Sequence, residues 1–343
     1  MRLRLIFFRL RRRQGALILA SLCIVLVELL HAALPSGGDT PHVAGTVPLD
    51  GGPSAVAVDP ETGYVYVAEL VAGAVAVFDG RTSPAHAGPQ LLATIPVGSA
   101  PAGIAVNPST GLVYVSNSGD NTVSVVDTQE NAVVAIARVG KTPLGLAVNV
   151  GTGVVYVANS GDNSLTAFDG ARASVLATLG VGTLPRAVAV NPATNRVYVA
   201  NFGSNDVTVI DAYTGSAIDR VPVGKYSTGL AIDAAANRIY VANDLGGDVS
   251  VIDGATDRVI AGVATGSHPW GVAVDPSRNL AYVANFGSGT VSILAGSHRA
   301  VSATVAGVPG PTGIAVDPAT HRAYVAESAA NRLAIISAAA VGR

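Results

Sequence analysis

Three features of this sequence predict an all-β fold of seven similar units: a phrase repeated at a fixed period, residue types that favour strands, and one extra strand-like segment near the amino end. The phrase is Tyr-Val-Ala/Ser-Asn/Glu, with tyrosines at Tyr66, Tyr114, Tyr156, Tyr198, Tyr240, Tyr282 and Tyr324. The first spacing is 48 residues and the other five are 42. A period in this range, with several short strands per unit, is typical of a blade of a β-propeller. We therefore expect a seven-bladed β-propeller.

One unit illustrates the four antiparallel strands expected in each blade. Residues 133–139 are apolar except for Arg138, and residues 145–149 form a short, nearly all-apolar run. Residues 155–159 contain the phrase, and residues 165–169 alternate. β-Branched and aromatic residues favour strands, and Gly, Pro, Asn and Asp between them favour turns. In propeller terms these are strands D, A, B and C, with strand A innermost.

The two ends of the repeat predict how the ring closes. Residues 333–337 form strand C of the last unit and lie almost at the end of the chain, so that blade lacks its own strand D. Residues 42–48 match the D strands and precede the first A strand. They can complete the last blade and leave no open edge in the ring. The extra residues before Tyr114 fall around residues 82–89, as a loop insertion between strands C and D of the first blade.

The amino terminus is predicted to be a targeting element. Six arginines in the first 13 residues precede an uninterrupted small and apolar run at residues 15–27. A cationic start followed by about 7–15 apolar residues is typical of a secretory signal. The alternative is an uncleaved anchor, since residues 15–34 approach the length of a spanning helix if Glu28 and His31 are tolerated.

We therefore assign residues 1–38 to a signal peptide or signal-anchor and residues 39–343 to the propeller. The propeller is expected to be exported and to be periplasmic, at the cell surface or secreted. In the anchor alternative, the amino-terminal segment holds it at the inner membrane, and this segment is the only membrane contact expected.

Charge argues against nucleic acid as a partner. Six of the 21 Lys and Arg residues lie in the first 13 positions, and Glu28 is the one acidic residue before Pro35, so the rest carries 15 basic against 22 acidic residues. An acidic body without a run of Lys or Arg suits a phosphate backbone poorly. The sequence also has no metal-spaced His/Cys set and no phosphate loop, so neither a metal nor a cofactor is expected.

The repeated motif resembles that of the YVTN-type β-propeller repeat family. Tyr-Val-Ala-Asn at residues 198–201 is preceded by Ala-Val-Asn-Pro at 189–192 and followed by Val-Ile-Asp at 209–211, and the match extends over residues 43–337. The resemblance implies a bacterial or archaeal protein, often exported or surface-associated and mostly without assigned activity. Similar seven-bladed folds include lactonases and lyases, which leaves an enzyme open by analogy.

Residues that recur in every blade are expected to be structural. The tyrosines should pack between blades. The asparagines that end the phrase should cap loops, and the aspartates that end the C strands should form Asx-turns. The asparagines are Asn117, Asn159, Asn201, Asn243 and Asn285, and the aspartates are Asp127, Asp169, Asp211 and Asp253.

Residues that differ between blades are the better candidates for a site. In the turns from strand D to strand A, the residue after the usual proline is Ser54, Ala102, Leu144, Arg186, Thr228, Trp270 or Thr312. Most of these are small, but Arg186 and Trp270 are not. The fifth blade adds Lys225 and Tyr226 to this turn, and the sixth has His268.

A second difference lies at the loops from strand B to strand C. The first and last blades have Glu69 and Glu327 where the other five have asparagine, and these two blades are neighbours once the ring closes. Both kinds of loop should meet around the mouth of the central channel. Polar and aromatic groups that converge at a concave mouth are typical of a ligand site. The alternative is that these loops vary freely because they are exposed.

The predicted ligand-binding residues are Arg186, Lys225, Tyr226, His268, Trp270, Glu327 and Glu69. We favour an exported protein that binds a small molecule or a protein partner at this mouth. A second hypothesis is a lactonase-like hydrolase or lyase that uses Glu327 and His268 as an acid–base pair. A third is a structural component of the cell envelope, which needs no site.

Overall fold

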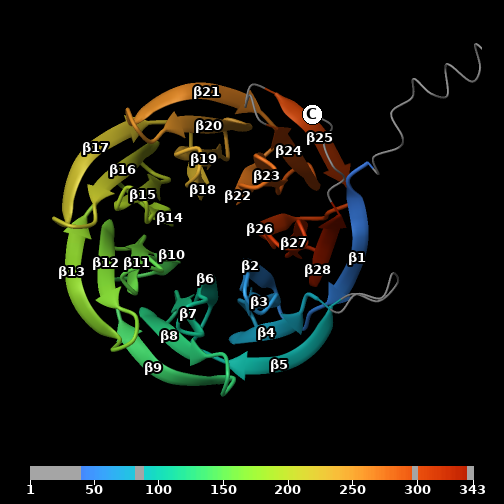
Figure 1. The fold of residues 1–343 in the computed structure, drawn as a ribbon, viewed down its shortest axis with the longest axis horizontal. Helices are drawn as coiled ribbons and strands as arrows, with labels where there is room; N and C mark the ends of the chain where they lie inside the picture. The colour runs from blue at the N-terminus through green and yellow to red at the C-terminus, as the bar shows by residue number, and fades with distance from the viewer. Residues whose placement is uncertain (1–39, 82–88, 296–299, 338–343) are drawn as a thin grey trace, which may run out of the picture. The chain divides into compact units, whose positions relative to one another are not determined.

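Seven four-stranded antiparallel sheets follow one another around a ring, each forming one blade (Figure 1). This computed structural model describes residues 40–81, 89–295 and 300–337, and all the regular structure in them is β-strand. The expected seven-bladed β-propeller is confirmed. Blade 1 begins with the first A strand, and blades 2 to 7 follow in chain order.

The strands fall into four concentric layers. The innermost A strands are β2 (Pro53–Val58), β6 (Pro101–Asn107), β10 (Pro143–Val148), β14 (Pro185–Asn191), β18 (Ser227–Asp233), β22 (Pro269–Asp275) and β26 (Pro311–Val316). The B strands are β3 (Tyr64–Glu69), β7 (Leu112–Asn117), β11 (Val154–Asn159), β15 (Arg196–Asn201), β19 (Arg238–Asn243), β23 (Leu280–Asn285) and β27 (Arg322–Glu327). The C strands are β4 (Ala74–Asp79), β8 (Thr122–Asp127), β12 (Ser164–Asp169), β16 (Asp206–Asp211), β20 (Asp248–Asp253), β24 (Thr290–Ala295) and β28 (Arg332–Ser337). The outermost D strands are β5 (Gln90–Pro96), β9 (Ala132–Arg138), β13 (Ser174–Gly180), β17 (Ser216–Pro222), β21 (Arg258–Ala264), β25 (Val301–Ala306) and β1 (His42–Pro48).

Burial explains the residue pattern of each layer. The B strands are buried on both faces, for example in β15, where every residue after Arg196 is buried. A short continuous apolar run suits such a strand. The outermost strands alternate instead, as β1 does between exposed and half-buried positions, because successive side chains point to opposite faces.

The expected Asx-turns join the C and D strands. The Asp127 carboxylate accepts hydrogen bonds from the backbone N–H groups of Gln129 at 2.7 Å and Glu130 at 3.1 Å. The other C strands that end in a predicted turn aspartate make the same pair of bonds, at Asp169, Asp211 and Asp253. This role of the aspartates is confirmed, and it lies at the end of the blade opposite the D–A turns.

The apolar core is divided among the interfaces between neighbouring blades. Tyr66 of blade 1 is fully buried in a cluster with Val77 of its own blade and with Ile104 and Val115 of blade 2. At the closing interface, Tyr324 of blade 7 packs in the same cluster as Phe78 of blade 1. The expected packing role of the tyrosines is confirmed.

The ring closes through β1. This strand pairs with β28 from His42 opposite Ser337 to Pro48 opposite Arg332, with a bulge between Val43 and Gly45. The first strand of the propeller therefore completes the last blade (Figure 1). The predicted closure and its residue range are confirmed.

Several expectations fall on residues outside the described ranges. They are the signal or anchor segment at residues 1–38 and most of the loop insertion, at residues 82–88. Residues 41–338 cluster as one compact unit, and the proposed boundary at residue 39 stays a prediction. The described ranges contain no helix long and apolar enough to cross a membrane.

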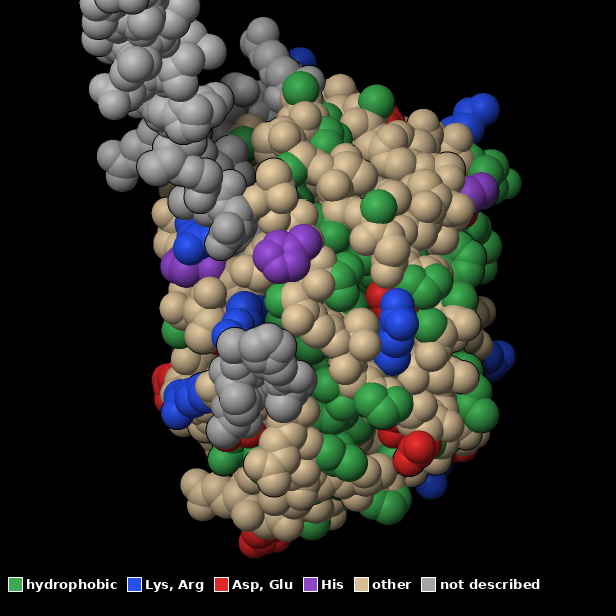
Figure 2. Space-filling view, turned by 90° about the vertical axis from the view of Figure 1, so that its right-hand side faces the viewer, with side chains coloured by type: hydrophobic (Ala, Val, Ile, Leu, Met, Phe, Trp, Pro, Cys, Tyr) green, Lys and Arg blue, Asp and Glu red, His purple; other side chains and the backbone are tan. Residues whose placement is uncertain are grey.

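The outer side of the ring near β1 and β25 carries no broad area of one charge on its visible part. Figure 2 shows Lys, Arg, Asp and Glu side chains there, singly or in small groups among uncharged surface. This visible part of the outer surface therefore offers no extended charged patch to a ligand.

Candidate functional site at the channel mouth

Two loops of every blade are joined at one end of the ring, which we call the mouth. The B–C loop donates a backbone hydrogen bond to the turn that enters strand A, as from Asp244 to the Tyr226 carbonyl at 2.9 Å and from Phe286 to the His268 carbonyl at 2.9 Å. Tyr226 and His268 have left-handed backbone conformations, with φ of 59° and 52°. Because these turns share one geometry, the residue that comes after each turn lies at an equivalent place around the mouth.

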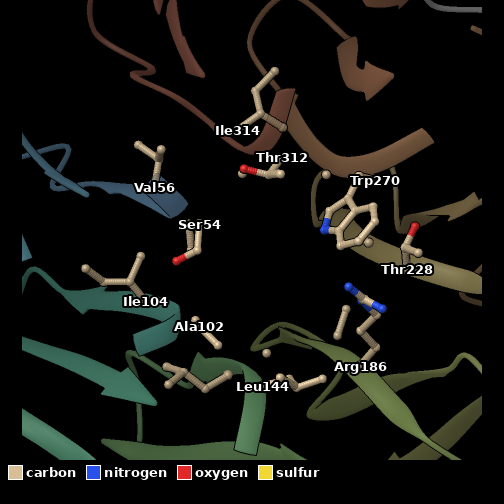
Figure 3. Close-up of a pocket in the computed structure, with 18 of the residues that line it drawn as sticks. Ser54, Val56, Ala102, Ile104, Leu144, Arg186, Thr228, Trp270, Thr312 and Ile314 are labelled. Carbon is tan, nitrogen blue, oxygen red and sulfur yellow. The ribbon is translucent and has the colours of Figure 1, made fainter. Parts of the chain in front are cut away.

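The channel at this end opens into a cavity of about 440 Å³. Its deeper tier, two residues further along each A strand, is a ring of branched aliphatic residues: Val56, Ile104, Leu146, Val188, Leu230, Val272 and Ile314. Its outer tier is the ring of variable residues after the turn: Ser54, Ala102, Leu144, Arg186, Thr228, Trp270 and Thr312. Figure 3 labels the whole outer tier around the opening, together with Val56, Ile104 and Ile314 of the deeper one. The side chains of the cavity are therefore apolar below, and its polar side chains lie at the rim.

Close approach of the A strands keeps this cavity narrow. A Cβ at Gly229 would overlap the Trp270 carbonyl oxygen of the next blade, and a Cβ at Gly271 would overlap the carbonyl oxygen of Thr312. Only glycine lets neighbouring backbones meet this closely. The residues just before these glycines are consequently fixed side by side around the rim.

The side chains of Arg186 in blade 4 and Trp270 in blade 6 are in contact, although blade 5 lies between these two blades. The Cζ atom of Arg186 is 4.1 Å from the centroid of the Trp270 ring and 5.4 Å from that of Phe202. The intervening residue, Thr228, is small and buried, so it leaves room for this contact. A guanidinium at this distance over an indole makes a favourable cation–π interaction.

Aromatic side chains extend this contact over three blades. Phe202 stacks on Tyr226 with ring centroids 4.5 Å apart and planes 15° apart. Trp270 lies against Phe286 at 5.5 Å. We call Arg186, Phe202, Tyr226, Trp270 and Phe286 the mouth cluster. It is built from turns and loops of blades 4, 5 and 6, and the rest of the described rim carries neither a charged nor an aromatic side chain.

The Arg186 guanidinium has aromatic neighbours but no polar partner. Among the described residues it donates no hydrogen bond and forms no ion pair. Burial lowers its pKa below the usual value for arginine, and the negative charge of Asp244 opposes that shift. A cationic group with five N–H donors loses free energy when it leaves water without acceptors. The donors of Arg186 are thus available to a ligand.

Asp244 is held by His268 rather than by Arg186. The His268 Nδ1 atom lies 2.7 Å from the Asp244 Oδ1 atom. The Asp244 side chain is 16% exposed and that of His268 is 50% exposed. The Asp244 carboxylate therefore pairs directly with the His268 imidazole and acts on Arg186 only through its charge.

Four of the seven predicted site residues come together in or beside the mouth cluster. They are Arg186, Tyr226, His268 and Trp270. Lys225 is exposed on the same turn as Tyr226. Glu69 and Glu327 lie at the mouth end of their strands but are 2% and 0% exposed, and neither lines the cavity.

The two glutamates have structural partners. The Glu69 carboxylate accepts a hydrogen bond from the Asp50 backbone N–H at 3.1 Å, and Glu327 accepts one from the Arg332 side chain. Burial raises the pKa of both carboxyl groups, opposed by these bonds. The suggested acid–base pair of Glu327 and His268 is therefore not formed, because each has a different partner.

Strand C explains why glutamate replaces asparagine in these two blades. The Asn159 side-chain N–H group donates to the hydroxyls of Ser164 at 3.0 Å and Thr166 at 2.8 Å, which lie in the adjacent strand C. The asparagines thus tie the B–C loop to strand C. The equivalent positions are Ala74 and Ala76 in blade 1 and Arg332 and Ala334 in blade 7, so neither blade offers an asparagine these acceptors.

Sequence comparison of the blades missed three residues of the site: Phe202, Asp244 and Phe286. All three follow the repeated phrase directly, at a position otherwise occupied by Leu70, Ser118, Ser160 and Ser328. The same blade-by-blade comparison, extended by one residue, would have found them. Within the described parts of the chain, no group of three or more His, Cys, Asp or Glu side chains is arranged to hold a metal ion.

Comparison with known proteins supports the fold. A solved structure of hydrazine synthase from Kuenenia stuttgartiensis is similar to this chain with a TM-score of 0.75 and 21% sequence identity, covering 86% of this chain and 98% of that chain. At this identity, the similarity shows the propeller fold alone. No protein-family profile matches the sequence, and no curated protein matches it.

Proposed function

We propose that this chain is an exported β-propeller that binds a small ligand in the cavity at the channel mouth and does not transform it. The observation that carries the proposal is the half-buried guanidinium of Arg186, which stands without a polar partner at the rim of an apolar cavity of about 440 Å³. Concave, mostly apolar cavities of about 300–1,000 Å³ with a few directed polar groups are typical of small-molecule sites.

The lining of the cavity favours binding over catalysis. Arg186 is the one ionisable side chain among the described residues that line it. The hydroxyls of Ser54, Thr228 and Thr312 donate to backbone carbonyls of their own or the neighbouring blade. A hydrolase or lyase needs an acid, base or nucleophile within reach of the reacting atoms. His268 and Asp244 lie outside this lining and are bonded to each other.

Two further parts of the proposal rest on the sequence. The repeated phrase favours membership in the YVTN-type repeat family, and the arginine-rich, apolar amino terminus favours export. An exported protein of this kind would meet its ligand outside the cytoplasm, in the periplasm, at the cell surface or beyond.

Trp270 makes the binding proposal directly testable. It is the only tryptophan of the chain, and it stands at the rim of the cavity, so its emission reports on a bound ligand. We expect a panel of small carboxylates, amines and neutral aromatic compounds to contain at least one that changes this emission saturably and raises the thermal unfolding midpoint.

Trp270→Phe is the control, because it should remove the emission signal. No saturable change with any compound by either measurement would contradict binding and favour a structural envelope component. Turnover of a bound compound, lost in His268→Ala while binding remains, would favour the enzyme instead.

A further inference from the structure

We infer that the ligand of this cavity is a small monocarboxylate with an apolar body, held by Arg186 at the rim and by the aliphatic ring below. The inference rests on the proposed binding function and assigns the chemical class of the ligand. Three features lead to it: the free donors of Arg186, the nearby charge of Asp244, and the lack of polar side chains deeper in the cavity.

The carboxylate follows from how Arg186 is held. Its guanidinium lies 4.1 Å from the Trp270 ring centroid and faces the opening (Figure 3). A contact with an aromatic ring uses no hydrogen-bond acceptor, so the guanidinium N–H groups stay available, and a pair of them matches the two oxygens of a carboxylate. No described protein acceptor takes these donors. A planar oxyanion is the ligand group that satisfies them best.

The preference for a ligand with a single negative charge follows from the position of Asp244. The Asp244 backbone N–H donates to the Tyr226 carbonyl at 2.9 Å, and Tyr226 stacks on Phe202 beside Arg186. The one cation of the described lining therefore has this carboxylate close by, and its charge acts on Arg186. The bond from Asp244 to His268 spans 2.7 Å and keeps the aspartate in place. A second negative charge on the ligand would have to leave water beside Asp244, and the described lining holds no second cation to offset this loss of hydration.

The apolar body follows from the deeper tier. Seven aliphatic side chains, one from each blade, form the wall below the rim. The rim hydroxyls are already bonded to backbone carbonyls. A ligand body that carries its own donors or acceptors would lose its bonds to water and find no polar side chain in this tier to replace them. An apolar body would gain free energy from burial.

Three probes that share one phenyl ring separate these features. Benzoate carries one negative charge, benzamide none, and phenyl phosphate mostly two at pH 7.5, since the second phosphate pKa is about 6. We expect the full chain, titrated at low salt with Trp270 emission as readout, to bind benzoate roughly tenfold or more tightly than benzamide, as a charge-assisted pair of hydrogen bonds allows. Benzoate should also bind more tightly than phenyl phosphate.

Variants assign each preference to its residue. In Arg186→Gln, the preference for benzoate over benzamide should fall to about twofold or less, since the charge that creates it is gone. In Asp244→Asn, phenyl phosphate should gain affinity relative to benzoate. Arg172→Gln is the matched control, because Arg172 is exposed, pairs with Asp169 and lies at the other end of the blade. It should leave all three affinities unchanged, and circular dichroism should confirm that each variant is folded.

The outcomes distinguish this inference from the binding proposal. If benzamide binds as tightly as benzoate, or if only other compounds of the panel bind, the cavity is a binding site and the assigned class is wrong. Tighter binding of phenyl phosphate than benzoate would overturn the single-charge requirement. If no compound of either set binds, both proposals fail together.

Discussion

Glu327 lies fully buried at the end of β27, and its carboxylate accepts a hydrogen bond from Arg332 in the adjacent strand β28. Burial raises its pKa above the ordinary value of 4.5, and the charge of Arg332 opposes that shift. A buried carboxylate depends strongly on its partner, because its remaining interactions cannot replace those of water. The mouth therefore carries an ion pair that supports the loop next to the site rather than the ligand.

Replacing Arg332 by methionine should destabilise the protein in a pH-dependent way. A carboxyl group whose pKa is higher in the folded than in the unfolded protein favours folding at low pH and loses this contribution as the pH rises through its folded pKa. Without Arg332 the pKa of Glu327 should rise further. We expect a loss of about 1–3 kcal/mol in the free energy of unfolding at pH 7.5, less than the roughly 3–5 for a fully buried pair.

Urea denaturation at pH 7.5 and at pH 4 measures this difference. The loss in Arg332→Met should shrink at pH 4, where Glu327 becomes neutral. Thr290→Val is the control, since it removes a neutral hydrogen bond that Asn285 donates at the equivalent place in blade 6. Its effect on the free energy of unfolding should be the same at both pH values. An equal loss for Arg332→Met at both pH values would contradict the role given to the ion pair.

At the scale of single elements, β1 carries the closure of the ring. Val43 and Val47 of this strand pack against the core clusters on either side of blade 7. The strand also covers the backbone edge of β28 along its whole length. An uncovered strand of this kind is a template for pairing with another chain.

Deletion of residues 42–48 should therefore cause self-association and lower stability. The apolar burial lost with Val43 and Val47, about 2–3 kcal/mol, should lower the thermal unfolding midpoint by roughly 5–10 °C. Light scattering after size-exclusion chromatography measures the association. A variant that lacks only residues 1–40 keeps β1 and should not gain this self-association. A deletion variant that is monomeric with an unchanged midpoint would show that β1 is dispensable.

At the scale of the whole molecule, the ring places every D–A turn and B–C loop at the mouth end, so one face is available to a ligand. For an exported protein this face would be presented outside the cytoplasm. The amino-terminal arginines and the apolar run that follows them support this location.

Export is expected to place the carboxyl end outside the cytoplasm. A reporter that is active only in the cytoplasm, fused after residue 343, should give no signal in cells that make the full chain. Removal of residues 1–38 is the matched control and should restore the signal. Activity of the reporter on the full chain would contradict export, and the mass of the exported protein would separate cleavage from anchoring.

The fold and its closure were predictable because they depend on short, local patterns. Tyr66 and its six counterparts occupy the same strand position in every blade, and the turn aspartates bond to backbone groups two or three residues away. Such local features recur with the repeat period of the sequence and can be identified without the structure. The spare segment at residues 42–48 was identifiable for the same reason, since it matches the strand that one blade lacks.

The sequence by itself determined the seven blades, the closing strand and the two unusual rim residues, Arg186 and Trp270. Only the tertiary structure decided that these two side chains touch, because their contact depends on the curvature of the ring and on the small Thr228 between them. It also decided the place of Glu327, since a carboxylate turns toward a cation in the adjacent strand rather than toward an apolar channel. Contacts between blades depend on the size and charge of side chains far apart in sequence, and no local period carries that information.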